Sequence, residues 1–470
     1  AGSFYAFTIW IGLGVYALYD FIQKKLKTPA AISAGISGAL CLLIPLQMAA
    51  ENWDDHDRSH RYSARDVAYN YLNSCDENAI LFTNGDNDTF PIWYLQEVEG
   101  VRTDVRVVNL SLLGTDWYID QMKCRMYESA PVPFKLSREN YIQGVNDFLQ
   151  VSEQLRGAVP VSTIMEFISN PRYHARTQGG DRVSYIPARN IAVPVNKENI
   201  LKNWKIEETV QPGWVSSSLD TSKLLDTMIV RITKNDIRKP DMMVLDLLAH
   251  NNWERPVHFV SMGGDMSLDL RNYCQYLGFT YKLVPLREAP KKQSVAINTD
   301  EFYNKMMNVY RWGNMNKKGI FVDYNNSFTL TLALNVRGMH ARLAEDLMNK
   351  GRDEEAVAVL DSAMVRMPAY NFPLNISAGQ NDVEIMNIIQ LYYRLGETAK
   401  ADALAEEFVA LTGKNLAFFS KLRNATYDLE MNLAYMQQMG TVLTPYNEEL
   451  STQVKQQLDF YLTMLGAQGR

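Results

Sequence analysis

Two long apolar runs open the chain, and each is long enough to cross a membrane as a helix. The first covers residues 4–22 with one charge, Asp20, near its end, and the second covers residues 30–50 with no charge. At ~1.5 Å per residue, helices of this length span the ~30 Å hydrocarbon core of a bilayer. The pattern predicts two transmembrane helices, with a buried hairpin of a soluble protein as the alternative.

Charges around these runs predict the orientation of the rest of the chain. Lys24, Lys25 and Lys27 lie between the two runs, whereas the acidic segment ENWDDHD follows the second. Short basic loops stay on the cytoplasmic side, so residues 51–470 are expected outside the cytoplasm. The chain begins AGSF, directly against the first run, so it is expected to be part of something longer, with further membrane helices before it.

The periodicity then changes to alternating helices and buried strands. Residues 62–73 have helical spacing, residues 78–84 form a short apolar run, residues 90–100 read as a helix and residues 104–113 as a second strand. A strand, a loop, a helix and a strand in this order predict a right-handed βαβ unit with parallel strands.

A further helix and strand are expected later in the chain. Residues 239–253 have helical spacing and residues 255–262 read as a strand, while residues 279–286 are expected to close an edge of the sheet. The intervening residues 150–238 are rich in β-branched and Pro-containing runs. They predict a β-rich insertion with hairpins rather than another crossover.

The last third of the chain is helical. Residues 342–368 and 388–413 share a pattern of helix, glycine turn and second helix with an alanine on its packing face: Gly351 with Ala356, and Gly396 with Ala401. This pattern is typical of tetratricopeptide-like repeats, with an ordinary helical bundle as the alternative. The repeats are expected to pack on helices at 301–312 and 419–438.

Length and net charge limit the number of domains and the kinds of binding partner that we expect. The 470 residues suggest about three structural units, and the net charge of −6 without a basic run gives no sign of a nucleic-acid partner.

The predicted domains are two transmembrane helices (1–50), the first part of a Rossmann-like α/β domain (51–149), a β-rich insertion (150–238), the second part of the α/β domain (239–300) and a helical tetratricopeptide-like region (301–470).

Acidic and aromatic residues follow both predicted parallel strands. Asp86 and Asp88 come after the first strand in GDNDTFP, and Asn109, Asp116 and Trp117 lie at the end of the second. Ligands of open α/β sheets bind beyond the carboxyl ends of the strands, so these five residues are candidate ligands of a carbohydrate or nucleotide sugar. The alternative is a turn in which Asp88 or Thr89 caps the helix that begins at Phe90.

Other polar residues give weaker signals. His56 and His60 are spaced to share a helix face, but HDRSH is not HExxH and lacks a third ligand, so a charged collar is favoured over zinc. His258 is expected to be a satisfied strand residue. Motifs for nucleophilic hydrolysis or nucleotide triphosphate binding are absent from the sequence. A disulfide among Cys75, Cys124 and Cys274 is possible, but the sequence does not choose a pair.

Four strings carry a resemblance to a known family: NWDDHDRSHR, ILFTNGDNDTFPIWYLQEVEGVRTDVRVVNLSLLGTDWYI, KPDMMVLDLLAHNNWERPVHF and RWGNMN. They resemble a bacterial family of multi-spanning membrane proteins, long of unknown function, that is similar to protein O-mannosyltransferases of the GT-C type. The family is related to a eukaryotic transmembrane O-mannosyltransferase. The resemblance covers most of the chain.

The resemblance implies a C-terminal extracytoplasmic part of an integral membrane glycosyltransferase in the bacterial inner membrane. It implies a polyprenyl-phosphate sugar donor, exported proteins as acceptors and a catalytic loop before this sequence, so no catalytic residue is carried over. The alternative is a non-enzymatic scaffold whose repeats recruit an envelope complex. A third possibility is a metal-dependent enzyme acting through Asp86 and Asp88, although no metal site is predicted.

Overall fold

The computed structural model describes most of the chain: residues 2–57, 59–176, 179–180, 182–204, 210–211, 214–215, 223–262, 266–286, 295–320, 336–375, 384–422 and 424–467. The chain divides into two compact units. The first contains Ala1–Arg61 and Gly319–Phe321, and the second contains Tyr62–Lys318 and Val322–Arg470.

The first unit is a pair of apolar helices, α1 (Gly2–Leu26) and α2 (Ala30–His56), which pack against each other. Both are long and apolar enough to cross a membrane, over Tyr5–Leu26 and Ala30–Trp53. Their large apolar side chains are mostly exposed, as expected for helices that face lipid rather than a protein core. The two helices predicted from the sequence are therefore present.

The expectation that His56 and His60 share one helix face is wrong. The helix α2 ends at His56, and His60 has a φ of 61°, which is outside the helical range. The four-residue spacing predicts a shared face only if the helix continues past His56.

The main sheet of the second unit has six strands in the order β16-β14-β15-β12-β1-β2. Strand β1, next to the edge strand β2, pairs in parallel with β2 on one side and β12 on the other, whereas β15 is antiparallel to β12. The strands are β1 (Ile80–Thr83), β2 (Arg106–Asn109), β12 (Val257–Phe259), β14 (Cys274–Tyr276), β15 (Tyr281–Leu283) and β16 (Ala296–Ile297).

The predicted βαβ unit is confirmed, because α4 (Asp86–Glu99) connects the parallel strands β1 and β2. Helix α3 (Ser63–Ser74) precedes β1, α5 (Asp116–Met122) follows β2, and α8 (Lys239–His250) precedes β12. Helix α4 begins at Asp86 rather than at Phe90, so Asp86 and Asp88 lie in its first turn and not in a loop. Carboxylates in a first turn are favoured by the helix dipole.

The prediction that residues 279–286 close an edge of the sheet is wrong. Strand β15 has β14 as its outer neighbour, and β16 lies beyond β14. A tight turn joins β14 to β15 at Gly278, whose φ is +89° and where a Cβ atom would lie 2.5 Å from Cε2 of Phe302. Strand β14 has only three residues, too few for a visible period-two pattern.

The insertion contains a second sheet in the order β13-β10-β7-β4. Strands β7 and β10 are antiparallel, but β4 and β7 are parallel and are linked through α6, so the expectation of hairpins without a crossover is wrong here. The elements are β4 (Ala158–Pro160), α6 (Val161–Ser169), β7 (Asn190–Pro194), α7 (Lys197–Asn203), β10 (Thr227–Ile232) and β13 (Leu268–Asp269). Three small two-stranded sheets pair β3 (Phe148–Gln150) with β11 (Asp236–Arg238), β5 (Ala175–Arg176) with β6 (Arg182–Val183), and β8 (Val210–Gln211) with β9 (Trp214–Val215).

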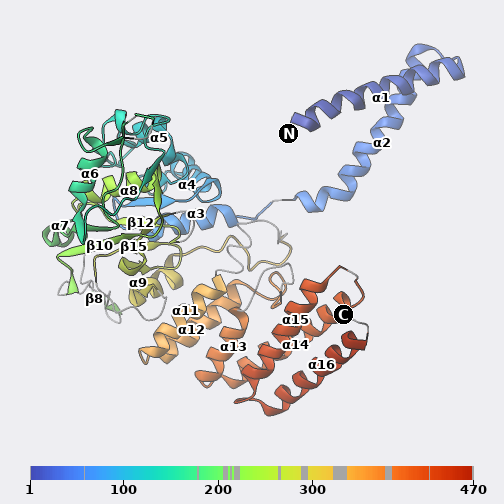
Figure 1. Cartoon of the computed structure of the whole chain (residues 1–470). Helices are drawn as coiled ribbons and strands as arrows, with labels where there is room; N and C mark the ends of the chain where they lie inside the picture. Colours follow the sequence, from blue (N-terminus) through green and yellow to red (C-terminus); the bar gives the residue numbers. More distant parts are fainter. Residues whose placement is uncertain are drawn as a thin grey trace. The chain divides into compact units, whose positions relative to one another are not determined.

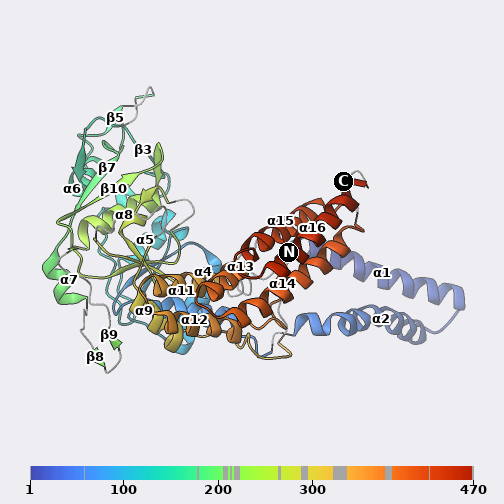
Figure 2. The ribbon, with the colours of Figure 1, turned by 90° about the horizontal axis from the view of Figure 1, so that it is seen from below.

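The C-terminal region is helical, as the orange and red ribbons of Figures 1 and 2 show. Its elements are α9 (Thr299–Asn304), the π-helical turn η5 (Lys305–Val309), α11 (Val336–Asn349), α12 (Asp353–Arg366), α13 (Glu384–Arg394), α14 (Thr398–Phe419), α15 (Thr426–Leu443) and α16 (Glu448–Ala467). The pairs α11–α12 and α13–α14 form hairpins, and α11 also contacts α9 and α13.

The turn and packing residues predicted for these hairpins are confirmed. Gly351 and Gly396 have φ angles of 72° and 81° between the paired helices, and Ala356 and Ala401 are fully buried. A positive φ is accessible to glycine without steric cost, which explains the sharp turns.

Candidate functional site at the carboxyl edge of the sheet

Two cavities of the second unit meet at the carboxyl ends of the parallel strands. Asn84 follows β1 and Ser261 follows β12, and both residues line both cavities. We call the first, of about 630 Å³, the helix pocket, because α11 and α13 line one side of it. We call the second, of about 1000 Å³, the tryptophan pocket, because Trp117 lines it. Both volumes lie in the range of ligand-binding cavities.

Aromatic side chains border the tryptophan pocket. Trp117 is 55% exposed and Phe148 is 66% exposed, so both rings offer apolar surface to a ligand. Trp117 contacts the ring of Tyr118 edge to face, with centroids 5.6 Å apart. The hydroxyl of Tyr118 accepts a hydrogen bond from the backbone N–H of Asn109 at 2.9 Å. The end of β2 therefore fixes the position of the Trp117 ring.

Asp116 also lines the tryptophan pocket, but both oxygens of its carboxylate accept hydrogen bonds from the protein. One oxygen accepts the backbone N–H of Trp117 at 2.8 Å, and the other accepts the backbone N–H of Gln143 at 3.3 Å. Arg138 lies 3.5 Å from the second oxygen. Asp116 thus ties α5 to the loop around Gln143 and shapes the wall of the pocket.

Asn109 is fully buried and contacts protein groups rather than either pocket. Its amide donates to the hydroxyl of Thr89 at 2.8 Å, and Thr89 in turn is hydrogen-bonded to Thr83 at 2.6 Å. This buried network links β1, β2 and the start of α4. Asn109 therefore positions the edge of the sheet.

Asp88 lines the helix pocket, whereas Asp86 is exposed on the first turn of α4 and lines neither pocket. An oxygen of Asp88 accepts the backbone N–H of Asn84 at 3.2 Å, one residue before the N-cap Gly85. The alternative that Asp88 or Thr89 caps a helix beginning at Phe90 is wrong, because α4 already begins at Asp86 and its N-cap has no side-chain hydrogen bond. Burial raises the pKa of Asp88, and the hydrogen bond from Asn84 offsets part of this increase. In the described part of the chain, Asp88 has no ion pair with Lys or Arg, so its carboxylate can accept hydrogen bonds from a ligand.

The helix pocket is closed on its other side by one face each of α11 and α13. Arg342 and Glu345 come from α11, and Asn387 and Arg394 come from α13. Arg394 lies 3.5 Å from Glu345, and the guanidinium of Arg342 lies 4.3 Å above the ring of Tyr276. This wall therefore carries guanidinium, carboxylate and amide groups, which together donate and accept hydrogen bonds.

The structure thus divides the five candidate residues of the sequence. Asp116 and Trp117 line one pocket, Asp88 lines the other, and Asn109 and Asp86 line neither. The pocket residues of α11 and α13 were missed because nothing in the sequence brings them to the sheet. Phe148 was missed because it lies in β3, which pairs only with β11 in its small sheet.

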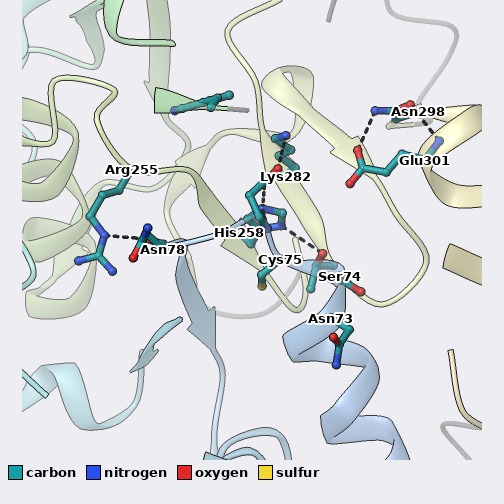
Figure 3. Close-up of polar contacts among 12 residues, drawn as sticks. Asn73, Ser74, Cys75, Asn78, Arg255, His258, Lys282, Asn298 and Glu301 are labelled. Carbon is teal, nitrogen blue, oxygen red and sulfur yellow. Dashed lines mark hydrogen bonds and ion pairs between the residues drawn. The ribbon is translucent and has the colours of Figure 1, made fainter. Parts of the chain in front are cut away.

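A separate polar cluster lies at the opposite, amino edge of the sheet. Oδ2 of Asp76 is 2.7 Å from Nε2 of His258, and Oδ1 of Asp76 is 2.9 Å from Nζ of Lys282. Figure 3 shows His258 and Lys282 close to Ser74 and Cys75, at the end of α3. Nδ1 of His258 is 3.2 Å from the hydroxyl of Thr280, so His258 is a satisfied strand residue, as predicted.

Charge pairing and hydrogen bonding stabilise the buried polar side chains of this cluster. Burial disfavours ionisation of Asp76, but the charge of Lys282 and the hydrogen bond from His258 outweigh it and hold the pKa of that carboxyl below its ordinary value. Burial lowers the pKa of His258. The cluster is therefore an ionised Asp76–Lys282 pair with a neutral imidazole, which is a stable structural arrangement.

A cavity of about 540 Å³ borders this cluster, with Asp76, Asn78, Trp204 and Arg255 among its lining residues. Figure 3 shows Arg255 hydrogen-bonded to Asn78, and Nε of Arg255 donates to the backbone oxygen of Asn78 at 2.8 Å. These contacts bind the starts of β1 and β12 together. We assign the cavity no ligand.

Neither a metal centre nor a disulfide is formed by the described residues. Among them, no group of three or more His, Cys, Asp or Glu side chains is arranged to hold a metal ion. Cys75, Cys124 and Cys274 are free thiols, with Cys75 and Cys274 buried and Cys124 exposed.

Comparison with known proteins places this site in a family. The family model described as TMEM260-associated domain 2 matches residues 64–301, more than half of the 470-residue chain. The chain belongs to this family. The TMEM260-associated region includes every residue that lines the tryptophan pocket and the sheet side of the helix pocket, whereas α11 and α13 lie beyond it.

One similar protein carries a named activity. It is "Protein O-mannosyl-transferase tmem260" of Dictyostelium discoideum, which is 26% identical over 121 residues. The matched segment covers 24% of this chain and 15% of the relative. No solved structure matches the chain.

Proposed function

We propose that this chain is the acceptor-binding region of an integral membrane glycosyltransferase. The enzyme transfers mannose from a polyprenyl-phosphate carrier to Ser or Thr hydroxyls of exported proteins. The observations that carry this proposal are the match of residues 64–301 to the TMEM260-associated domain and the similarity of a 121-residue segment of the chain to a protein named as an O-mannosyl-transferase. Because the matched segment is a small part of that relative, the activity of the whole protein is a proposal for this chain.

Two features of the chain support the membrane part of the proposal. Helices α1 and α2 are long and apolar enough to cross a membrane. Lys24 and Lys25 lie in the last turn of α1 and Lys27 in the short connection to α2, which favours a cytoplasmic position for this end of the helix pair and an extracytoplasmic position for the second unit. We propose the bacterial inner membrane, with residues 51–470 on the periplasmic side.

The two pockets support the acceptor-binding part. They lie at the carboxyl edge of the parallel strands, where Rossmann-like folds bind ligands. The hairpins α11–α12 and α13–α14, proposed as tetratricopeptide-like repeats, place a polar wall against the same edge. In this proposal the described residues hold the acceptor, and a GT-C type membrane region of the enzyme carries out the transfer.

Transfer by the full-length protein tests the proposal. The protein, purified in detergent, is incubated with radiolabelled polyprenyl-phosphate mannose and a Ser/Thr-rich peptide. We expect label in the peptide, and none in a control peptide with every Ser and Thr replaced by Ala. Absence of label from both peptides, with donor and protein intact, contradicts the proposal.

A scaffold is the second function that an observation favours. Helices α14, α15 and α16 expose large apolar side chains, including Phe418, Tyr427 and Phe460, and such side chains are common in protein interfaces. Affinity purification with and without residues 340–470 separates the two functions. Stoichiometric partners that are lost on truncation, without a change in protein glycans, favour the scaffold.

A further inference from the structure

The two pockets are adjacent but offer different chemistry. Asn84 and Ser261 line both, so a ligand that extends past these residues reaches from one pocket to the other. The tryptophan pocket has exposed aromatic rings, whereas three aromatic residues of the helix pocket, Tyr71, Tyr276 and Phe279, are buried and a fourth, Tyr281, is half-buried. The two pockets are therefore suited to different parts of one ligand.

The tryptophan pocket suits a sugar. A pyranose ring presents C–H groups on one face and hydroxyls around its edge. The exposed rings of Trp117 and Phe148 offer apolar surface for the C–H face. The side chains of Asn84, Gln143 and Asp147 line the same pocket and can hydrogen-bond to hydroxyls.

The helix pocket suits a polypeptide segment. Its wall on α11 and α13 carries Arg342, Glu345, Asn387 and Arg394, groups that pair with backbone N–H and C=O groups and with polar side chains. On the opposite side, the carboxylate of Asp88 is free of ion pairs in the described part of the chain and can accept a hydrogen bond from a ligand N–H or O–H. Tyr71, Tyr276 and Phe279 are buried and Tyr281 is half-buried, so the described aromatic residues of this pocket offer a sugar less ring surface than Trp117 and Phe148 do.

We propose that the two pockets together bind an O-glycosylated peptide, with the sugar in the tryptophan pocket and the peptide in the helix pocket. This inference rests on the proposed function and extends it: the region recognises the product of transfer, a sugar attached to a Ser or Thr of an exported protein. Retention of the product places neighbouring Ser and Thr residues of the same acceptor near the enzyme for further transfer.

Calorimetric titration of the full chain in nanodiscs tests the inference with three probes. These are a Thr-containing peptide carrying one O-linked mannose, the same peptide without the sugar, and methyl α-mannoside. We expect the glycopeptide to bind about tenfold tighter than the bare peptide, and the free sugar to bind most weakly. Equal affinity for glycopeptide and bare peptide overturns the proposal, as does absence of binding by all three probes.

Three variants locate the two parts of the ligand. Trp117→Ala is expected to reduce the ratio of glycopeptide to bare-peptide affinity to about one. Arg394→Ala is expected to weaken both peptides by the same factor, about tenfold, and to preserve their ratio. Phe90→Ala, which removes an exposed aromatic side chain of α4 that lines neither pocket, serves as the matched control and is expected to change neither affinity.

The outcomes also distinguish this inference from the proposed function. An unchanged affinity ratio in Trp117→Ala, with a urea midpoint equal to that of the unmodified chain, overturns the inference. If the full-length protein transfers mannose but shows no preference for glycopeptide, the proposed function survives and the inference fails. If it prefers glycopeptide but transfers no sugar, the inferred binding holds and the transferase proposal fails.

Discussion

Nε2 of His258 lies 2.7 Å from Oδ2 of Asp76, and this contact joins strand β12 to the segment that follows α3. The same carboxylate also pairs with Lys282 of β15. Asp76→Asn removes the negative charge and leaves the buried ammonium of Lys282 without its counter-ion. We expect a loss of about 3 kcal/mol in the free energy of unfolding, measured by urea denaturation at pH 7.5.

The matched control is Asp226→Asn. Asp226 pairs with Lys197 at 2.7 Å, but this pair is exposed, so its loss is expected to cost less than about 1 kcal/mol. The double variant Asp76→Asn/Lys282→Met is expected to recover part of the loss, because no unpaired buried charge is left. Equal effects of Asp76→Asn and Asp226→Asn contradict a structural role for the cluster.

Stability is expected to fall in mild acid because of His340 in α11. This imidazole is fully buried, its Nδ1 lies 2.7 Å from the backbone oxygen of Val336, and burial lowers its pKa to about 4. Between pH 6.5 and about 4, the unfolded chain binds a proton here that the folded chain does not. The free energy of unfolding therefore falls as the pH is lowered through this window, by up to about 3 kcal/mol.

Urea denaturation at pH 7.5 and pH 4.5 measures this contribution as a difference between the unmodified chain and His340→Gln. The variant has no titratable group at this position, so its stability is expected to depend less on pH. Titrations elsewhere in the chain cancel in the comparison. The same pH dependence in both proteins contradicts the prediction.

The hairpin α11–α12 is expected to depend on a buried leucine. Leu360 of α12 is fully buried, whereas Val365 of the same helix is 68% exposed. Leu360→Ala leaves a cavity and is expected to cost about 2–5 kcal/mol, whereas Val365→Ala is expected to cost less than about 0.5 kcal/mol. Thermal unfolding followed by circular dichroism compares the two, and similar losses in both variants contradict the packing described for α12.

Metal binding at the GDND segment is expected to be weak or absent. Asp88 lines the helix pocket and accepts a backbone N–H, whereas Asp86 is exposed and lines neither pocket. Calorimetric titration with Mn²⁺ or Ca²⁺ is therefore expected to give no micromolar binding. Micromolar affinity that is abolished by Asp86→Asn contradicts this account.

Local patterns predicted most of the central architecture. The short apolar runs around Ile80 and Val107 predicted the parallel strands, and Gly351 and Gly396 predicted the turns between paired helices. Such features follow from a few neighbouring residues, so they are visible without the rest of the fold. The start of α4 was placed one turn late, because Gly, Asn and Asp are common in turns, whereas here Asp86 and Asp88 lie in the first turn of the helix.

The site could be predicted only in part, since it is assembled from distant segments. Trp117 and Asp116 were found because they follow a strand in the sequence. Arg342 and Arg394 lie more than 200 residues further along the chain and reach the same edge only through packing of α11 and α13. No local pattern distinguishes these arginines from exposed residues of an ordinary helix.

Glycan analysis of exported proteins tests the central claim most directly. Glycopeptides from the envelope of a strain that lacks the gene for this protein are compared, by mass spectrometry, with those of the parent and of the complemented strain. The account predicts that O-linked hexose on Ser and Thr is lost in the deletion strain and returns on complementation. An unchanged set of glycopeptides in the deletion strain would contradict it.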